Sequence, residues 1–428
     1  MEISSILKEE YGLTDKVIEL SKKAEENVKE HFSAIDETAE YNQLKVMRAF
    51  SKNRVSEAHL GLSTGYGYDD LGRDTLEKIY AEVFGTEKAL VRHSIVSGTH
   101  AICSCLFGIL RPGDILVSAT GAPYDTLEEI IGKRGSGNGS LKEWGIDYIE
   151  VGLTPDGKID KAALLEVLKN KKVKMVELQR SKGYAWRESF TVEELAGAID
   201  FIKNTRADVV VMVDNCYGEF VQRQEPTNVG ADIIAGSLIK NPGGGLALTG
   251  GYLAGRADLV EQVSYRLTSP GIGAEVGATL GQNRNMYQGF FMAPHTVAQS
   301  LKTAVFAAEV FSLLGFETAP TSSEMRGDII QAVKLDSAEN LCAFCQGIQR
   351  GAPIDSFVVP EPWDMPGYSD KVIMAAGAFV SGASIEMSAD GPLREPYAAY
   401  MQGGLTYESG KLSVLCAADN IIKLKMGR

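Results

Sequence analysis

The sequence predicts an α/β protein, with a large domain built on a mostly parallel sheet and a smaller α+β domain at the C-terminal end. Short apolar runs alternate with helical stretches between about residues 90 and 255, which is typical of a parallel sheet covered on both faces. After about residue 310 strands and helices mix differently. The 428 residues, 44% hydrophobic and 23% charged, are enough for two or three globular domains.

We expect three parts: an N-terminal helical segment (1–60), a large domain (61–300) and a small domain (301–428). In the first part, one apolar helix face is expected to pack against other elements. It contains Leu44, Val46, Met47 and Phe50. A glycine- and tyrosine-rich loop follows at 63–72. A helix is then expected over Asp74–Phe84, ended by Gly85.

The large domain contains seven apolar runs that we expect as strands, at 89–91, 114–118, 148–151, 173–178, 209–213, 233–237 and 251–254. Helices are expected between them at 100–110, 125–133, 160–169 and 192–204, and residues 256 to about 310 are also expected to be helical. Ligands of such sheets bind at the carboxyl ends of the strands. Polar residues directly after an apolar run are therefore the first candidates for a site.

Charge and composition exclude several functions. Lys and Arg number 43 against 56 Asp and Glu, a net charge of −13 without a basic block, so we expect no nucleic-acid partner and no anionic membrane partner. No run of about 18 apolar residues predicts a membrane span, and the first residues (MEISS) lack a positively charged start followed by an apolar stretch, so we expect a cytoplasmic protein. The six cysteines are expected as buried thiols. Cys342 and Cys345 have CxxC spacing without a second pair, and we expect no metal site.

Lys240 and Asp214 are the strongest candidates for chemistry. Lys240 is expected to end a buried strand, against the glycine-rich stretch that follows it, where partial burial would lower its pKa toward neutrality. A neutral amine there can form a Schiff base with an aldehyde. Asp214 follows the apolar run 209–213. Pyridoxal phosphate (PLP) needs such a pair, an acid for its ring nitrogen and a lysine for its aldehyde. Taken by itself, Asp214 after a strand is more typical of a helix N-cap.

Further residues are consistent with the rest of that cofactor. Ser97, Gly98 and Thr99 precede a helix and could bind a phosphate with backbone N–H groups and a hydroxyl, although an ordinary helix cap has the same pattern. The Ser237 hydroxyl could also bind the phosphate, or it could make its hydrogen bonds within its own strand. Tyr124 follows another strand and could stack on a flat ring, or only pack.

The order and spacing of these residues resemble the Cys/Met-metabolism group of fold-type-I PLP enzymes, which includes methionine γ-lyase and cystathionine lyases. A closer resemblance, to the branch of methionine γ-lyase-like and cystathionine β-lyase-like "aluminium resistance" proteins, rests on three segments: STGYGYDDLGRDTLE (63–77), TGAPYDTLEEIIG (120–132) and QGGLTYESGKLSVL (402–415). The resemblance covers the chain from about residue 40 to its end.

The resemblance implies a PLP-dependent transferase fold and a role for each candidate. Lys240 binds the cofactor and moves the substrate's α-proton, and Asp214 pairs with the ring nitrogen. Gly98, Thr99 and Ser237 bind the phosphate, and Tyr124 stacks on the ring and is a candidate to assist proton transfer.

In the family, a Tyr-x-Arg segment from a neighbouring subunit reaches the phosphate. In this sequence Tyr66 aligns with the tyrosine of that segment, and Tyr68 occupies the position of the arginine. Arg73 is a possible replacement for the missing positive charge. We therefore expect a homodimer or homotetramer with its active site at the subunit interface.

Other departures from the family concern the substrate. The arginine that binds the substrate's α-carboxylate aligns with Lys411, and Arg394 is the alternative that we prefer on chemical grounds. Arg180 and Lys182 follow a strand and face the cofactor or the substrate, or are solvated loop charges.

The expected function is that of a carbon–sulfur lyase acting on a small sulfur amino acid, by γ-elimination from methionine or β-elimination from cystathionine or cysteine. The alternatives are another PLP reaction, such as γ-replacement or aldol cleavage, and a non-catalytic PLP-binding protein. A dinucleotide-binding protein is disfavoured, because no GxGxxG follows the first strand.

Overall fold

The computed structural model describes residues 2–365 and 370–427 and divides into two compact units, each assembled from separated stretches of chain. The parallel-sheet unit consists of Tyr41–Gly183 and Ser189–Ala293. The antiparallel-sheet unit consists of Met1–Glu40, Tyr184–Glu188 and Pro294–Arg428. Two long helices, α2 (Asp15–Lys52) and α9 (Asn283–Leu313), contribute residues to both units.

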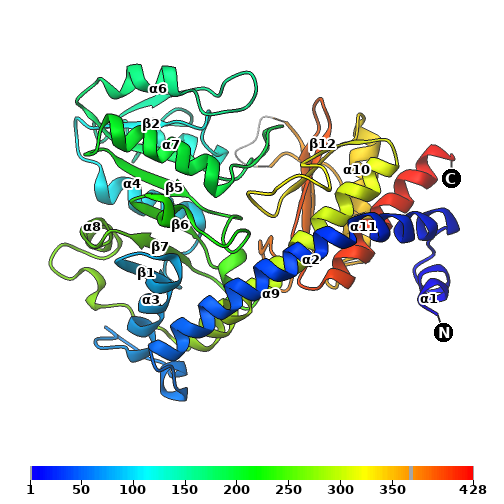
Figure 1. The fold of residues 1–428 in the computed structure, drawn as a ribbon, viewed down its shortest axis with the longest axis horizontal. Helices are drawn as coiled ribbons and strands as arrows, with labels where there is room; N and C mark the ends of the chain where they lie inside the picture. The colour runs from blue at the N-terminus through cyan, green and yellow to red at the C-terminus, as the bar shows by residue number, and fades with distance from the viewer. Residues whose placement is uncertain (1, 366–369, 428) are drawn as a thin grey trace. The chain divides into compact units, whose positions relative to one another are not determined.

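The parallel-sheet unit contains a seven-stranded sheet in the order β1-β7-β6-β5-β4-β2-β3 (Figure 1). The strands are β1 (Lys88–Arg92), β2 (Ile115–Ser118), β3 (Asp147–Glu150), β4 (Val173–Gln179), β5 (Val210–Asp214), β6 (Ile233–Ser237) and β7 (Gly251–Gly255). Strands β3, β2, β4, β5 and β6 are parallel, whereas β7 is antiparallel to both β6 and β1. All seven predicted strands are confirmed, each end within one residue of its expected position.

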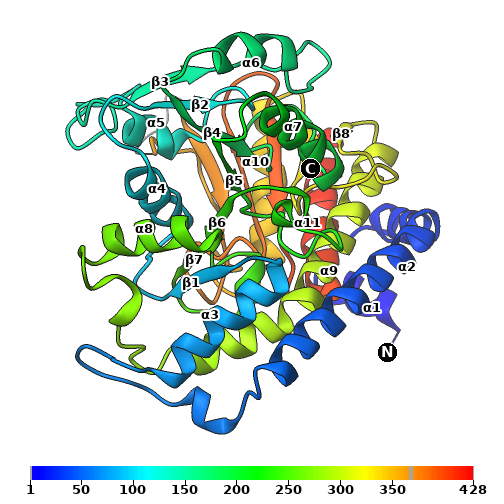
Figure 2. The same cartoon turned by 60° about the vertical axis from the view of Figure 1, so that its left-hand side comes forward.

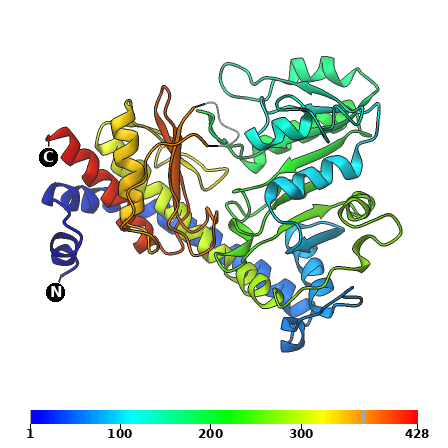
Figure 3. The same ribbon diagram turned by 180° about the vertical axis from the view of Figure 1, so that it is seen from behind.

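Helices cover both faces of this sheet, as its apolar strands require. Helices α4 (Gly98–Ile109), α5 (Asp125–Ile131) and α8 (Ala257–Leu267) pack on one face and share one apolar core with it. Helices α3 (Leu71–Phe84) and α7 (Val192–Thr205) lie on the other face, and α6 (Lys161–Leu168) packs beside α7 (Figures 1 and 3). Gly85 ends α3 with φ 65°, a left-handed conformation that favours glycine, as predicted.

The antiparallel-sheet unit contains a five-stranded sheet in the order β10-β11-β12-β9-β8. Its strands are β8 (Glu317–Ala319), β9 (Gln331–Lys334), β10 (Val372–Ala375), β11 (Ser388–Pro392) and β12 (Ala398–Gln402). Helices α10 (Ala338–Arg350) and α11 (Tyr407–Lys425) pack together and share a core with this sheet and with α9 (Figure 2). The short helix α1 (Ile3–Glu9) begins the chain.

Four short 3-10 helices complete the described elements: η1 (Glu57–Leu60), η2 (Pro226–Val229), η3 (Asn241–Gly243) and η4 (Gly273–Glu275). Among the helices in residues 2–365 and 370–427, none is both long enough and apolar enough to cross a bilayer.

Candidate active site

Asp214 and Lys240 lie close to each other at the carboxyl ends of the neighbouring strands β5 and β6. Asp214 is the last residue of β5, as predicted. Lys240 is not on a strand, contrary to our expectation: β6 ends at Ser237, and Lys240 directly precedes η3. The strand ends there because its partner β7 begins at Gly251, the residue paired with Ser237. The chain then turns, and Gly243 comes so near the carbonyl of Leu238 that no other residue fits.

Asp214 is buried, and burial raises the pKa of its carboxyl, while the charge of Lys240 and a hydrogen bond from the backbone N–H of Cys216 (3.1 Å) oppose that increase. A buried carboxylate needs a compensating positive charge. The protonated nitrogen of a pyridine ring provides one, so Asp214 fits the role expected for it.

The electrostatic environment of Lys240 differs from the sequence prediction. Burial by itself would lower its pKa, but interactions with four neighbouring side chains outweigh burial and raise it above the ordinary value: Cys216, Tyr217, Asp214 and Glu219. The expectation of a lowered pKa considered burial alone, and it is wrong for the chain without a bound aldehyde. The protein therefore holds Lys240 as an ammonium ion until its proton is removed.

The turn after β5 supplies two residues that the sequence reasoning missed. The Tyr217 ring lies against Lys240, with Nζ 3.9 Å from the ring centroid, and its backbone is left-handed (φ 71°). Glu219 is fully buried and accepts a hydrogen bond from the hydroxyl of Tyr252 (2.8 Å). Burial raises the pKa of Glu219 to about 8. A side chain at Gly236 would collide with this pair, its Cβ 2.5 Å from the Glu219 carboxylate. Neither role has a signal in the local sequence pattern.

The predicted phosphate-binding residues lie together at the start of α4. Gly98 is the first residue of α4, and Ser97 caps the helix by accepting a hydrogen bond from the N–H of His100 (3.0 Å). A Cβ at Gly98 would lie 3.0 Å from the Cys216 sulfur and 3.4 Å from Cβ of Ser237. Only glycine at position 98 therefore leaves space in the corner formed by Ser97, Gly98 and Ser237. The first N–H groups of a helix have no partner within it and attract anions, so the corner fits a phosphate.

Two further candidates border this region. The Thr99 hydroxyl lies 3.0 Å from that of Thr126. Tyr124 directly precedes α5, and its ring packs near Gly183, where a Cβ would lie 3.5 Å from ring atom Cδ2. Ring stacking by Tyr124 stays a prediction.

Arg180 belongs to a buried ion pair rather than to a substrate-facing loop. Its side chain is fully buried, and Nη1 donates to Asn215 Oδ1 (2.8 Å) and to Glu225 Oε2 (3.2 Å). Gly218 makes room for the guanidinium, because a Cβ there would lie 2.5 Å from Arg180 Cδ. The structure therefore corrects the expected role: Arg180 holds the turn that carries Asp214. Lys182 is also buried, so it is not a solvated loop charge.

The tyrosines of the 63–72 loop are exposed, and their contact with another subunit stays a prediction. Tyr66 and Tyr68 are 70% and 61% exposed, and their rings stack with centroids 5.5 Å apart. Asp70 anchors the loop by accepting hydrogen bonds from Ser63 and from the Thr279 hydroxyl (3.0 Å).

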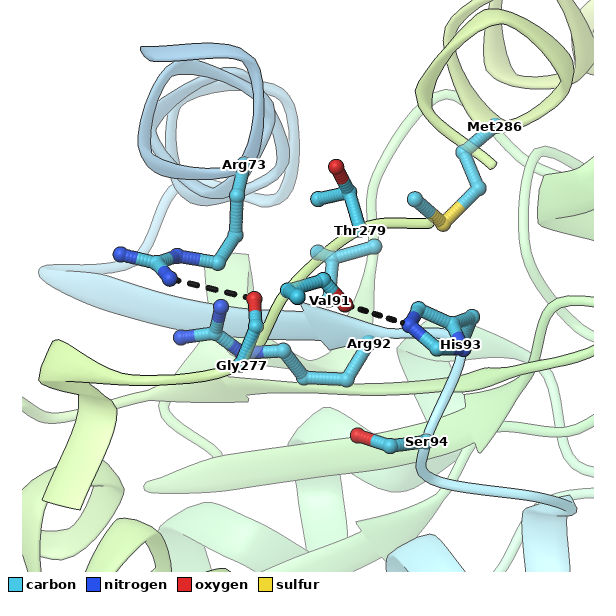
Figure 4. A pocket seen from close by; sticks show the side chains of 9 residues that line it. Arg73, Val91, Arg92, His93, Ser94, Gly277, Thr279 and Met286 are labelled. Carbon is cyan, nitrogen blue, oxygen red and sulfur yellow. Dashed lines mark hydrogen bonds between the residues drawn. The ribbon is translucent and has the colours of Figure 1, made fainter. Parts of the chain in front are cut away.

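Arg73 does not replace the missing arginine, because its guanidinium is buried and bonded to the carbonyls of Gly67 (2.5 Å) and Gly277 (3.2 Å). Figure 4 shows Arg73 and Arg92 beside a small pocket between the end of β1 and residues 277–279. Arg92 pairs there with Glu77 (3.0 Å). This pocket is lined by neither Lys240 nor Asp214.

The two candidates for the substrate carboxylate lie in the antiparallel-sheet unit, each in an ion pair. Lys411 binds Glu25 (2.6 Å), and Arg394 binds Asp370 (2.9 Å) with its side chain 55% exposed. Both stay predictions.

Comparison with known proteins agrees with this geometry. The family model for methionine gamma-lyase matches residues 17–422. A solved structure described as a carbon–sulfur lyase involved in aluminium resistance, from Clostridium novyi NT, is 50% identical, covers 98% of this chain and 100% of its own, and superposes with a TM-score of 0.95. The protein YnbB of Bacillus subtilis (strain 168) is 56% identical over 393 residues, 92% of this chain and 93% of that protein. Cystathionine gamma synthase from Xanthomonas oryzae pv. oryzae shares the fold at 17% identity, with a TM-score of 0.62 over 89% of this chain and 98% of its own.

The fold and the residues gathered at the ends of β5 and β6 define a fold-type-I PLP enzyme. The chain belongs to the methionine gamma-lyase family. The resemblance stated from the sequence is confirmed, and with it the α/β fold class, the cofactor and the carbon–sulfur lyase class.

Proposed function

We propose that this enzyme binds PLP through Lys240, Asp214 and the corner formed by Ser97, Gly98 and Ser237, and eliminates a thiol from a sulfur amino acid. The observation that carries the proposal is that Lys240 and Asp214 are close enough to shift each other's pKa, next to a corner at Gly98 that suits a phosphate. The candidate substrates are methionine, cleaved at Cγ–S, and cystathionine or cysteine, cleaved at Cβ–S.

In this mechanism each residue of the site has a defined task. The bound cofactor supplies an electron sink for the charge left when the substrate loses its α-proton. Asp214 keeps a proton on the ring nitrogen, and the start of α4 with Ser237 and Thr99 fixes the phosphate. Lys240 Nζ, once deprotonated, accepts the α-proton.

The remaining parts of the proposal concern substrate binding and assembly. Arg394 is the better candidate for the α-carboxylate, because its exposed ion pair costs little to exchange. Exposed Tyr66 and Tyr68 support a homodimer or homotetramer in which this loop reaches a neighbour's phosphate. The domains would be 61–300 and 301–428, after a helical segment of residues 1–60. Six free cysteines support a cytoplasmic location.

An absorbance scan of the purified protein with PLP, before and after borohydride, tests the cofactor site. The near-visible band of a lysine-bound cofactor should disappear on reduction, and the pyridoxyl group should be found on the peptide that contains Lys240. Lys240→Ala should lose the band. Lys45→Ala is the matched control and should keep the band. Burial lowers the pKa of Lys45, so this lysine would also be reactive if a lowered pKa alone decided which lysine binds the cofactor. A reducible linkage in Lys240→Ala would refute the assignment.

Product analysis by mass spectrometry tests the reaction. We expect 2-oxobutyrate with methanethiol from methionine, or pyruvate from cystathionine or cysteine. A normal band without turnover of any amino acid would instead indicate a non-catalytic PLP-binding protein. An amino-acid product with a new group at Cγ, formed without a 2-oxo acid, would indicate γ-replacement.

A further inference from the structure

The contact between Tyr217 and Lys240 has no assigned role in the chemistry above. The ammonium nitrogen lies 3.9 Å from the ring centroid, well inside the distance of about 6 Å within which a cation is attracted to an aromatic face. Both side chains are partly sheltered from water, which strengthens such an attraction.

The backbone holds Tyr217 in this place at a conformational cost. Residues 215–218 form a tight turn, closed by the N–H of Gly218 on the carbonyl of Asn215 (2.9 Å). Tyr217 is the third residue of the turn and has φ 71°, a conformation in which a bulky residue is uncommon and glycine is usual. A strained residue that persists at a reacting group suggests a function for its side chain.

The chemistry of Lys240 indicates what that function is. When Lys240 acts as the base, the Cα–H bond of the substrate breaks, its electron pair stays with the substrate carbon, and the proton moves to Nζ. Nζ thereby gains a positive charge. A group that attracts the ammonium ion more than the neutral amine stabilises this step selectively, which is the requirement for catalysis. The face of an aromatic ring has that preference, because its quadrupole acts on charge.

We propose that Tyr217 is a further catalytic residue of this enzyme: the face of its ring stabilises the ammonium form of Lys240 and thereby assists the transfer of the substrate's α-proton to Nζ. The proposal rests on the proposed function, since it assumes that Lys240 is the base. Other groups that act on Lys240 are Asp214, at the end of β5, and Cys216 and Glu219, in the turn after it. All of them are unchanged in the variants below.

The first experiment uses the full chain freed of PLP. Reaction of Lys240 with potassium cyanate, which needs the neutral amine, is followed against pH by peptide mass spectrometry, with Lys45 in the same digest as internal control. Tyr217→Leu should react about tenfold faster than the parent protein at a pH below the midpoint, because the ammonium ion has lost a favourable contact. Tyr217→Phe keeps the ring and should remain within about twofold.

The second experiment uses the PLP-loaded enzyme and an amino acid without a leaving group, such as alanine. Exchange of its α-proton with solvent deuterium, followed by NMR, should slow about tenfold in Tyr217→Leu and stay near the parent rate in Tyr217→Phe. If Tyr217→Leu does not fold, Tyr217→Met replaces it as an unbranched side chain without a ring.

Equal behaviour of the leucine and parent proteins in the cyanate experiment would overturn the proposal. An equal decrease of the α-proton exchange rate in Tyr217→Leu and Tyr217→Phe would also overturn it, because the hydroxyl and not the ring would then be responsible. The cyanate result does not depend on turnover, so failure of this proposal is distinguishable from failure of the lyase assignment, which the borohydride experiment tests.

Discussion

Replacing Arg180 by methionine separates the structural role seen here from the substrate-binding role that the sequence suggested. Methionine keeps much of the side-chain volume and removes the charge. Glu225 would then remain buried without its cationic partner, and Asn215 and Gln222 would each lose a hydrogen bond from the guanidinium.

The expected loss of stability follows from these contacts. Removing one partner of a buried ion pair typically costs about 3–5 kcal/mol, because the remaining charge has no compensation. The side chains of both Arg180 and Glu225 are 0% exposed, so solvent screening does not reduce this cost. We expect the free energy of unfolding to fall by about 3–5 kcal/mol, and by less in the double variant Arg180→Met/Glu225→Gln, which removes both charges of the pair.

Urea denaturation with saturating PLP measures this difference. Lys169→Met is the matched control: its ion pair with Glu166 (2.6 Å) is about two-thirds exposed, and its loss should change stability by less than about 1 kcal/mol. The reasoning would be refuted if Arg180→Met unfolded like the parent protein while KM alone increased. Arg180 would then be a substrate ligand.

Four further outcomes are expected. Asp214→Asn should lower turnover by about two orders of magnitude or more, since an amide cannot keep the ring nitrogen protonated; unchanged steady-state rates would contradict this role. Gly98→Ala places a methyl group 3.0 Å from the Cys216 sulfur and should weaken PLP binding about tenfold in a spectroscopic titration, whereas an unchanged Kd would show that the corner does not hold the phosphate. Glu219 has a raised pKa of about 8, so between about pH 4.5 and about pH 8 the folded state binds a proton that the unfolded state releases; stability falls as the pH rises through this window, and Glu219→Gln should flatten that slope in denaturation curves. Mixing inactive Lys240→Ala and Tyr66→Ala subunits should restore about a quarter of native activity in a dimer whose sites combine two chains, and no recovery after subunit exchange would argue against a shared site.

The sequence was a good guide to the sheet and to Asp214, because both depend on local pattern. Apolar runs bounded by glycine and polar residues can be recognised without knowing their neighbours, and an acid after such a run lies at the carboxyl edge. The position of Lys240 was misjudged by three residues, because the end of β6 depends on where its partner β7 begins.

Other features depend on contacts between distant parts of the chain. The sign of the Lys240 pKa shift comes from acidic groups of the turn after β5, which no local pattern around Lys240 reveals. Arg180 looked like a loop charge, because its partner Glu225 lies 45 positions further along the chain. The role of Tyr217 follows from a backbone angle that side-chain patterns do not encode.

The turn from Asp214 to Phe220 has a consequence for how such enzymes diversify. It is closely packed at three points: Gly218 against the Arg180 side chain, the Cys216 sulfur against Gly98, and the Glu219 carboxylate against Gly236. Exchanging any one of these residues would displace the others, so this stretch tolerates little variation. New substrate preferences must therefore arise elsewhere, on surfaces that can change without disturbing the groups that hold and move the proton.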